Sequence, residues 1–296
     1  MRKTPLALLA ATAVALSLAA CSSGDANAGA KFDLSTVKKD DAIAALLPEK
    51  IAGAGKLVVG MDTSYAPADY LDADGTTPIG YDVDIAKAIG AVLGVEADVQ
   101  SADFTGIIPA IGSKYDVGIS SFTINADRLQ QANMIQYFEA GESYAVQKGN
   151  PAKVDPADIC GKIVGVQTGT VEDEELTAKI DECKGAGKPE PQPLRYEAQS
   201  DVTTALVGGK ADLMWADSPI IAYAIEQTGD KLEQLGDVFE SAPQGIVVSK
   251  DDPALTEAIQ KAVQKLIDDG TYGKILDAWG NADGAVAEAV LNPSVG

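Results

Sequence analysis

The sequence contains no histidine. This absence excludes imidazole general bases, Ser-His-Asp triads and most zinc sites, because those chemistries depend on the imidazole ring. Basic residues are scarce as well, since 23 lysines and arginines face 44 aspartates and glutamates, for a net charge of -21. A body of this charge repels nucleic acid and anionic lipid surfaces. We therefore expect no nucleic-acid partner, no metal and no cofactor.

Long hydrophobic runs are also missing, because a membrane-spanning helix needs roughly 20 apolar residues and no segment reaches that length. The apolar run at 6–18 follows two basic residues and ends in Leu18-Ala19-Ala20-Cys21. This pattern is typical of a lipoprotein export signal. Cleavage after Ala20 would leave Cys21 as the lipid-bearing N-terminus, and an ordinary secretory signal is the alternative. The sequence predicts a body tethered by lipid to the outer face of the cytoplasmic membrane.

Cysteine occurs three times. With Cys21 assigned to the lipid, Cys160 and Cys183 remain as an even pair in an oxidising compartment, and a disulfide between them is the first interpretation. Its closure would stabilise the fold by roughly 3 kcal/mol in the chain-entropy model. A catalytic thiol is the alternative, but no histidine or basic cluster is present to lower the thiol pKa.

Strand patterns alternate with helical patterns along the chain. The predicted strands are 56–61, 116–120, 162–167, 192–196 and 211–216. The predicted helices are 82–93, 107–111, 172–183, 201–207 and 254–268. Such alternation indicates parallel sheets covered by helices. The prediction is an α/β protein with two doubly wound sheets.

The order of these patterns divides the chain into two units. We expect a signal peptide at 1–20 and a lipidated N-terminus, stalk and short helix at 21–54, with the folded part starting near Lys56. Lobe 1 is predicted at 55–138 and 248–281, lobe 2 at 144–241, and a C-terminal tail at 282–296. The closing helix 254–268 is expected to pack in lobe 1, and crossing strands are expected near 137–144 and 241–247.

Ligands of open α/β sheets bind at the carboxyl ends of the strands. The residues at those ends are Asp62, 121–123, 168–170 and Asp217. They are the candidates for a binding site.

Several stretches resemble the family 3 extracellular solute-binding proteins of polar amino acid ABC transporters. They are Met61-Asp62-Thr63-Ser64-Tyr65-Ala66-Pro67, Gly80-Tyr81-Asp82-Val83-Asp84, Phe104 to Ala110, Ser121-Phe122-Thr123 through Arg128, and Asp269 to Gly280. Each is weak alone, but their shared order and spacing over 56–280 make the resemblance strong. It implies a two-lobed periplasmic-binding-protein-like fold with crossing hinge strands. It also implies a binding component that delivers a polar amino acid to permease subunits.

The resemblance assigns roles to the candidate residues. Arg128 can grip a carboxylate with two parallel hydrogen bonds, and Thr123 adds a hydroxyl from the same loop. Gly169 and Thr170 precede a helix whose N-terminus favours the same carboxylate. Asp217 matches the acid that receives the α-ammonium, with a helix N-cap as the alternative role.

The remaining matches concern the ligand's side chain. Tyr65 and Phe104 match aromatic walls, and Ser121 belongs to the same lobe 1 set. Asp62 and Glu172 fall at side-chain-contacting positions, where two carboxylates would repel a glutamate. A glutamine-like or basic amino acid is therefore expected. Ala68 departs from the family's usual phenylalanine and can widen the pocket, and the segment 133–136 also departs from the common pattern.

Two other classes of protein are alternatives. A cyclohexadienyl-dehydratase-like enzyme on the same fold would use a pocket acid such as Glu172 or Asp173 as a general acid. A sensor ectodomain would need a transmembrane segment after the fold, which the sequence does not show. We expect a monomeric binding protein rather than an enzyme.

Overall fold

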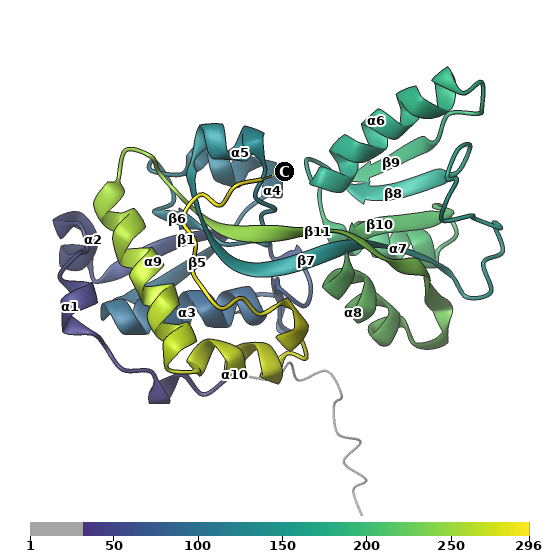
Figure 1. Cartoon of the computed structure of the whole chain (residues 1–296). Coiled ribbons are helices and arrows are strands. Elements are labelled where there is room, and N and C mark those ends of the chain that lie inside the picture. The colour runs from purple at the N-terminus through teal and green to yellow at the C-terminus, as the bar shows by residue number, and fades with distance from the viewer. Residues whose placement is uncertain (1–31, 296) are drawn as a thin grey trace, which may run out of the picture.

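The computed structural model describes residues 32–295. The predicted signal peptide, Cys21 and the stalk at 22–30 lie outside the described residues. Two lobes stand side by side and are linked by two long strands that run through both (Figure 1). The domain boundaries expected from the sequence stay a prediction.

The first lobe contains elements from both ends of the chain. Its helices are α1 (Asp41–Ala44), α2 (Glu49–Ala54), α3 (Tyr81–Leu93), α4 (Phe104–Ile107), α5 (Ala126–Gln131), α9 (Pro253–Asp268) and α10 (Thr271–Ala278), with 3₁₀ turns at Leu34–Thr36, Ile108–Ala110 and Ala282–Gly284. Its strands are β1 (Lys56–Met61), β5 (Glu96–Ser101) and β6 (Val117–Gly118), with a small antiparallel sheet of β2 (Ser64–Tyr65), β3 (Asp69–Leu71) and β4 (Pro78–Ile79).

The second lobe is formed by the middle of the chain. Its elements are β8 (Ile163–Gln167), α6 (Val171–Gly185), β9 (Gln192–Tyr196), α7 (Gln199–Val207), β10 (Leu213–Asp217) and α8 (Ser218–Thr228), followed by a 3₁₀ turn at Gly229–Lys231. The two long strands are β7 (Asn133–Gln147) and β11 (Leu232–Val248).

The strands form one continuous sheet in the order β5-β1-β6-β11-β7-β10-β8-β9. Parallel groups lie at its two ends, where β1 pairs with β5 and β6 and where β8 pairs with β9 and β10. The antiparallel pair β7 and β11 joins them. The predicted α/β class with crossing hinge strands is confirmed, and the hinge strands connect the two expected sheets into one hydrogen-bonded series.

Helix α3 shows how the first core forms. Ile85, Ile89 and Leu93 recur on one stripe and are fully buried. The helix ends where Gly94 adopts the left-handed conformation at φ 72°, which glycine reaches without steric cost. Helix α9 packs against α3, so the closing helix lies in the first lobe as predicted.

The folded part begins earlier than the sequence suggested. Residues 33–54 form a 3₁₀ turn and two short helices, and Leu47 and Ile51 are buried in the first core. The Asp40 amide also donates to the Val92 carbonyl at 2.9 Å. The expectation of a start near Lys56 was wrong, because these helices are too short for hydrophobic periodicity to reveal.

The C-terminal tail packs beside the hinge strand. The Gln136 amide donates to the Val290 carbonyl and the Asn292 amide donates to the Met134 carbonyl, each at 2.8 Å. These bonds pair an edge of β7 that is otherwise free of strand partners in the first lobe.

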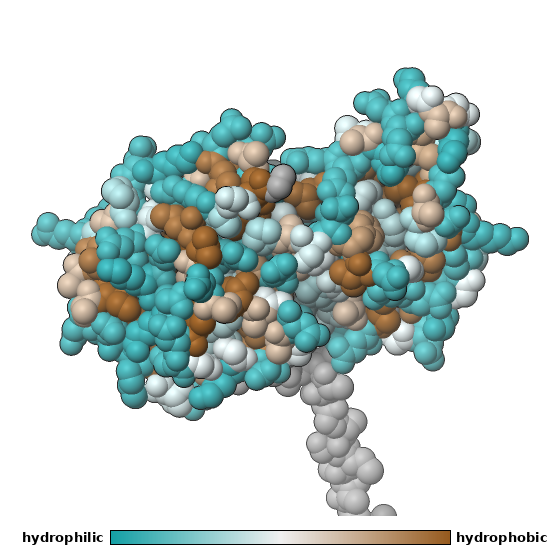
Figure 2. Space-filling model, in the orientation of Figure 1, coloured by the Kyte–Doolittle hydropathy of each residue, from teal (hydrophilic) through white to brown (hydrophobic). Residues whose placement is uncertain are grey.

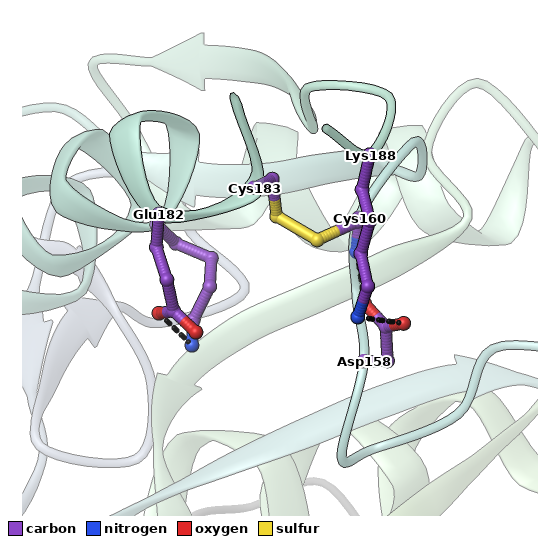
Figure 3. The surroundings of a disulfide bond; sticks show 6 residues. Asp158, Cys160, Glu182, Cys183 and Lys188 are labelled. Atoms are coloured by element: carbon purple, nitrogen blue, oxygen red, sulfur yellow. Dashed lines mark hydrogen bonds and ion pairs between the residues drawn. A yellow bond between two sulfur atoms is a disulfide. The ribbon is translucent and has the colours of Figure 1, made fainter. Parts of the chain in front are cut away.

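Cys160 and Cys183 form a disulfide, which confirms the predicted pairing (Figure 3). It ties the loop before β8 to the last turn of α6. The Lys188 ammonium donates to Asp158 at 2.8 Å nearby.

The surface is mostly hydrophilic over both lobes on the face drawn in Figure 2. Among residues 32–295, no helix has the length and apolar character required to span a membrane.

Candidate functional site

The candidate residues meet between the two lobes. Tyr65 of the first lobe donates to Asp217 of the second at 2.7 Å, and the Gln199 amide donates to the Ser64 hydroxyl at 3.0 Å. These contacts join residues more than a hundred positions apart in sequence. They hold the lobes against each other across the strand ends, where the sheet topology predicted the site.

Arg128 is buried at the centre of this contact, with 7% of its surface exposed. Its Nη1 donates to the Thr123 carbonyl at 2.8 Å in the first lobe, and its Nη2 donates to the Gly169 carbonyl at 3.2 Å in the second. The Asn125 side chain accepts from the Arg128 amide and so starts helix α5 at this place.

No carboxylate among the described residues forms an ion pair with Arg128. Both of its protein acceptors are neutral carbonyls. A buried guanidinium without an ionic partner is suited to bind an anionic group, since such a group would compensate the buried charge.

Phe104 and Phe122 form an aromatic pair beside Arg128. Their ring centroids are 4.8 Å apart and the rings are nearly parallel. The Arg128 Cζ atom lies 5.4 Å from the centre of Phe104 and 5.9 Å from that of Phe122. The aromatic faces therefore stabilise the guanidinium by cation–π contact.

Asp217 ends β10 and precedes α8. Its side chain makes no cap hydrogen bond to the helix, which is the alternative role considered from the sequence. Instead it accepts from the Tyr65 hydroxyl and, at 3.0 Å, from Gln244 Nε2. Burial raises the pKa of Asp217 to about 6. At neutral pH the carboxylate is ionised and can bind a cation.

Asp62 lies at the end of β1 and is 5% exposed. It accepts from the Ser64 amide at 3.1 Å and from Gln167 Nε2 of the second lobe. Burial raises the pKa of Asp62. A cleft of about 550 Å³ adjoins Asp62 and is lined also by Asp103, Lys114 and Ala198.

Gln167 is a site residue that the sequence reasoning missed. Its Nε2 also donates to the Glu197 carbonyl at 2.8 Å, while its Oε1 is buried without a hydrogen-bond partner among the described residues. The sequence could have indicated Gln167 as a site residue, because it is the last residue of β8 and directly precedes the candidates at 168–170.

Glu172 lies in the first turn of α6 with 2% of its surface exposed. Its Oε1 has no hydrogen-bond partner among the described residues. Burial raises the pKa of Glu172 well above its usual value, and the negative charge of Asp217 adds to the shift.

Backbone amides at the N-terminus of α6 donate hydrogen bonds to side chains of the same segment. Thr170 caps the helix by accepting from the Asp173 amide at 3.3 Å. The Gly169 amide donates to the Asp173 carboxylate at 3.1 Å, and Asp173 also pairs with Arg195 at 2.5 Å. The Gly169 carbonyl, rather than its amide, faces Arg128 in this structure.

Ser121 lies beside the other candidates, and one of its hydrogen-bond partners is Asp82 of helix α3. Its amide and hydroxyl both donate to Asp82, at 2.9 and 3.2 Å. Thr123 bridges to Gln244 of β11 and presents its carbonyl to Arg128.

Negative charge dominates the buried polar groups. Among residues 32–295 the buried carboxylates are Asp62, Asp69, Asp82, Asp84, Glu142, Glu172, Asp173 and Asp217. Arg128 is the one buried cation of the same residues. No group of three histidine, cysteine, aspartate or glutamate side chains in the described part of the chain is arranged to hold a metal ion.

Comparison with known proteins decides the family. The model of the bacterial extracellular solute-binding proteins, family 3, matches residues 57–282. The chain belongs to this family. The resemblance stated from the sequence motifs is therefore confirmed, and the two-lobed fold of these solute-binding proteins is the one described above.

Individual relatives agree with this family. The arginine-binding protein ArgT of Corynebacterium glutamicum is 34% identical, over 84% of this chain and 82% of the relative. The ABC transporter glutamine-binding protein GlnH of Bacillus subtilis is 30% identical, over 95% and 97%. The solved structure of an ancestral arginine-binding protein bound to arginine has a TM-score of 0.70 and 34% identity, covering 76% of this chain and 98% of that one. These relatives are binding proteins, and this solute-binding protein is not an enzyme.

Proposed function

We propose that this solute-binding protein captures a cationic amino acid outside the cytoplasmic membrane and delivers it to an ABC importer. The observation that carries the proposal is the buried charge, because Asp62, Glu172 and Asp217 are all buried at or just after strand ends, while Arg128 is the one buried cation of residues 32–295. A zwitterionic head group uses one positive and one negative protein group. Two carboxyl groups with raised pKa values then remain, and a second positive charge on the ligand would stabilise their ionised forms.

The head group would be held at its two ends by different lobes. Arg128 of the first lobe receives the α-carboxylate together with the Thr123 segment, and Asp217 of the second receives the α-ammonium. Ser121, Gly169 and Thr170 belong to the same end of the site. Because each lobe supplies one charge, the ligand binds both only when the lobes meet, and closure becomes the signal for delivery.

The distal end of the ligand's side chain would lie between Asp62 and Glu172. Gln167 adds a neutral acceptor there, since its Oε1 is buried without a partner among the described residues. A guanidinium offers five N–H donors, which suits several separate acceptors. Tyr65 and Phe104 supply aromatic surface for the apolar stem. The names of the arginine-binding relatives support the same ligand class.

Titration calorimetry with arginine and citrulline tests the ligand class. The two ligands have nearly the same shape, but citrulline carries a neutral urea in place of the guanidinium. Hydrogen bonds to charged groups contribute about 1.5–3 kcal/mol, so arginine should bind roughly 10- to 150-fold more tightly than citrulline. Asp62→Asn should narrow this ratio. Equal binding of the two, or tighter binding of citrulline or glutamine, would reject a cationic ligand.

We propose further that the mature chain is anchored by lipid at Cys21, on the basis of the Leu18-Ala19-Ala20-Cys21 motif. Cys21→Ser should release the protein into the medium or leave an uncleaved precursor, because the thioether to the lipid requires the thiol. Detergent phase partitioning of the full chain measures this. Partitioning into the detergent phase of a variant that has been processed to the size of the mature parent would contradict the anchor.

A further inference from the structure

Asp82 is a buried carboxylate that the proposed binding scheme does not use. It lies in the first turn of α3, within the stretch Gly80-Tyr81-Asp82-Val83-Asp84, and is fully buried. Its two oxygens contact two separate parts of the molecule. One part is the carboxylate-binding segment, defined as residues 121–128, and the other is the hinge strand β7.

The first oxygen holds the start of the carboxylate-binding segment. Asp82 Oδ2 accepts from the Ser121 amide at 2.9 Å and from the Ser121 hydroxyl at 3.2 Å. Ser121 has a φ of 49°, in the left-handed region that residues other than glycine rarely adopt. Such a conformation costs on the order of 1 kcal/mol or more and persists only where surrounding contacts stabilise it.

This turn sets the direction of the residues that follow it. Phe122 stacks on Phe104, and Thr123 presents its carbonyl to Arg128. The position of the guanidinium therefore depends on the backbone turn at Ser121, and that turn is bonded to Asp82.

The second oxygen holds the hinge strand. Asp82 Oδ1 accepts from the Tyr137 hydroxyl at 2.6 Å. Tyr137 belongs to β7, which continues into the second lobe and pairs there with β10, so that Glu142 lies opposite Asp217. The Tyr137 hydroxyl is also within 3.2 Å of the Ser121 amide. One carboxylate thus connects the Arg128 segment to the strand that reaches Asp217.

We infer that Asp82 is a positioning residue that couples the grip on the ligand's α-carboxylate to the hinge strand between the lobes. The inference rests on the proposed function in taking Arg128 and residues 121–128 as the binding site of the α-carboxylate, but it does not depend on which amino acid is bound. Burial raises the pKa of Asp82 to about 6, so the group is ionised at neutral pH and accepts from all three donors. A neutral side chain of the same shape would present a donor to one of them.

Asp82→Asn tests the inference with two ligands, arginine and argininamide, which lacks the α-carboxylate. Loss of charge-assisted hydrogen bonds is worth about 1.5–3 kcal/mol, so arginine binding should weaken roughly 10- to 150-fold. Argininamide binding should change far less, and the preference for arginine over argininamide should fall about tenfold or more. A purely structural role would weaken both ligands equally, and that result, or an unchanged preference, would overturn the inference.

Asp84→Asn is the matched control. Asp84 is a buried carboxylate of the same helix, but its Oδ2 accepts from Trp279 at 2.8 Å rather than from the carboxylate-binding segment. Its substitution should leave the preference for arginine over argininamide unchanged. If the parent protein binds another amino acid better than arginine, the same comparison is made with that amino acid and its α-amide, so the two proposals fail separately.

Two further variants keep the inference testable if Asp82→Asn folds poorly. Tyr137→Phe leaves the hydrogen bonds between Asp82 and Ser121 intact and removes the hydrogen bond between Asp82 and the hinge strand β7. It should preserve the preference for arginine but reduce ligand-induced closure, measured by small-angle scattering at saturating ligand. Ser121→Gly should recover part of the loss in the Asp82→Asn background, because glycine adopts a positive φ freely. Unchanged closure with Tyr137→Phe would overturn the coupling, and no recovery with Ser121→Gly would overturn the positioning role.

Discussion

Arg128→Ala is expected to weaken amino acid binding by roughly 100- to 3000-fold. Removing one member of a buried charge pair costs about 3–5 kcal/mol, because the partner charge is left desolvated, and each 1.4 kcal/mol is a factor of ten. Here the partner is the ligand's α-carboxylate, since the protein acceptors of Arg128 are the neutral carbonyls of Thr123 and Gly169. Titration calorimetry with the tightest-binding amino acid measures the loss.

The size of the effect should follow the geometry of the guanidinium. Arg128→Lys keeps the charge but loses the planar pair of donors, so its loss should be intermediate. Asp217→Asn should also weaken binding, though less, because the amide oxygen still accepts from the α-ammonium. Lys261→Ala removes a half-exposed lysine paired with Glu257 on α9, and affinity should stay within about twofold. Parent-like binding by Arg128→Ala would show that the carboxylate is held elsewhere.

Acidification from about pH 8 to about pH 5 is expected to raise the stability of the protein and to lower its affinity for the ligand. Burial raises the pKa values of Asp82 and Asp217 to about 6, from an ordinary value of 3.8. Between these values the folded state binds more protons than the unfolded state. The free energy of unfolding therefore falls as the pH rises through 6 and recovers as the pH falls, by about 1.4 kcal/mol per group and pH unit.

Binding responds with the opposite sign, because a cation binds only the ionised form of Asp217. Affinity should fall by about tenfold per pH unit below pH 6, from this group alone. Thermal denaturation without ligand measures the pH dependence of stability, and calorimetry with arginine measures the pH dependence of affinity. Asp217→Asn should make the affinity less dependent on pH. The stability trend ends near pH 4, close to the ordinary pKa of these carboxyl groups, where the unfolded state also becomes protonated. Below that pH, Asp74, whose pKa the Thr77 hydrogen bonds lower, acts in the opposite direction, because the unfolded state binds its proton first. A constant affinity across the range would contradict the role of Asp217.

Much of the fold could be predicted from local patterns. Strand β1 and helix α9 begin and end within one residue of the predicted bounds, because their hydrophobic periodicity is long and regular. The cysteine count led directly to the Cys160–Cys183 disulfide. A short helix was expected before Lys56, but its packing into the first core was not. Strand β5 was missed, since it is half-buried along its length and shows no clean alternation.

The sequence by itself determined the α/β class, the disulfide, the family and the strand-end positions of Asp62 and Asp217, because motifs and periodicities are properties of neighbouring residues. Only the tertiary structure decided which distant groups meet. Gln167 contacts Asp62 across 105 positions, and Tyr65 contacts Asp217 across 152. Asp82 joins Ser121 to the hinge strand in the same way. Such contacts depend on how two lobes close over a shared sheet, and burial there, rather than residue type, raises the pKa values of the carboxylates.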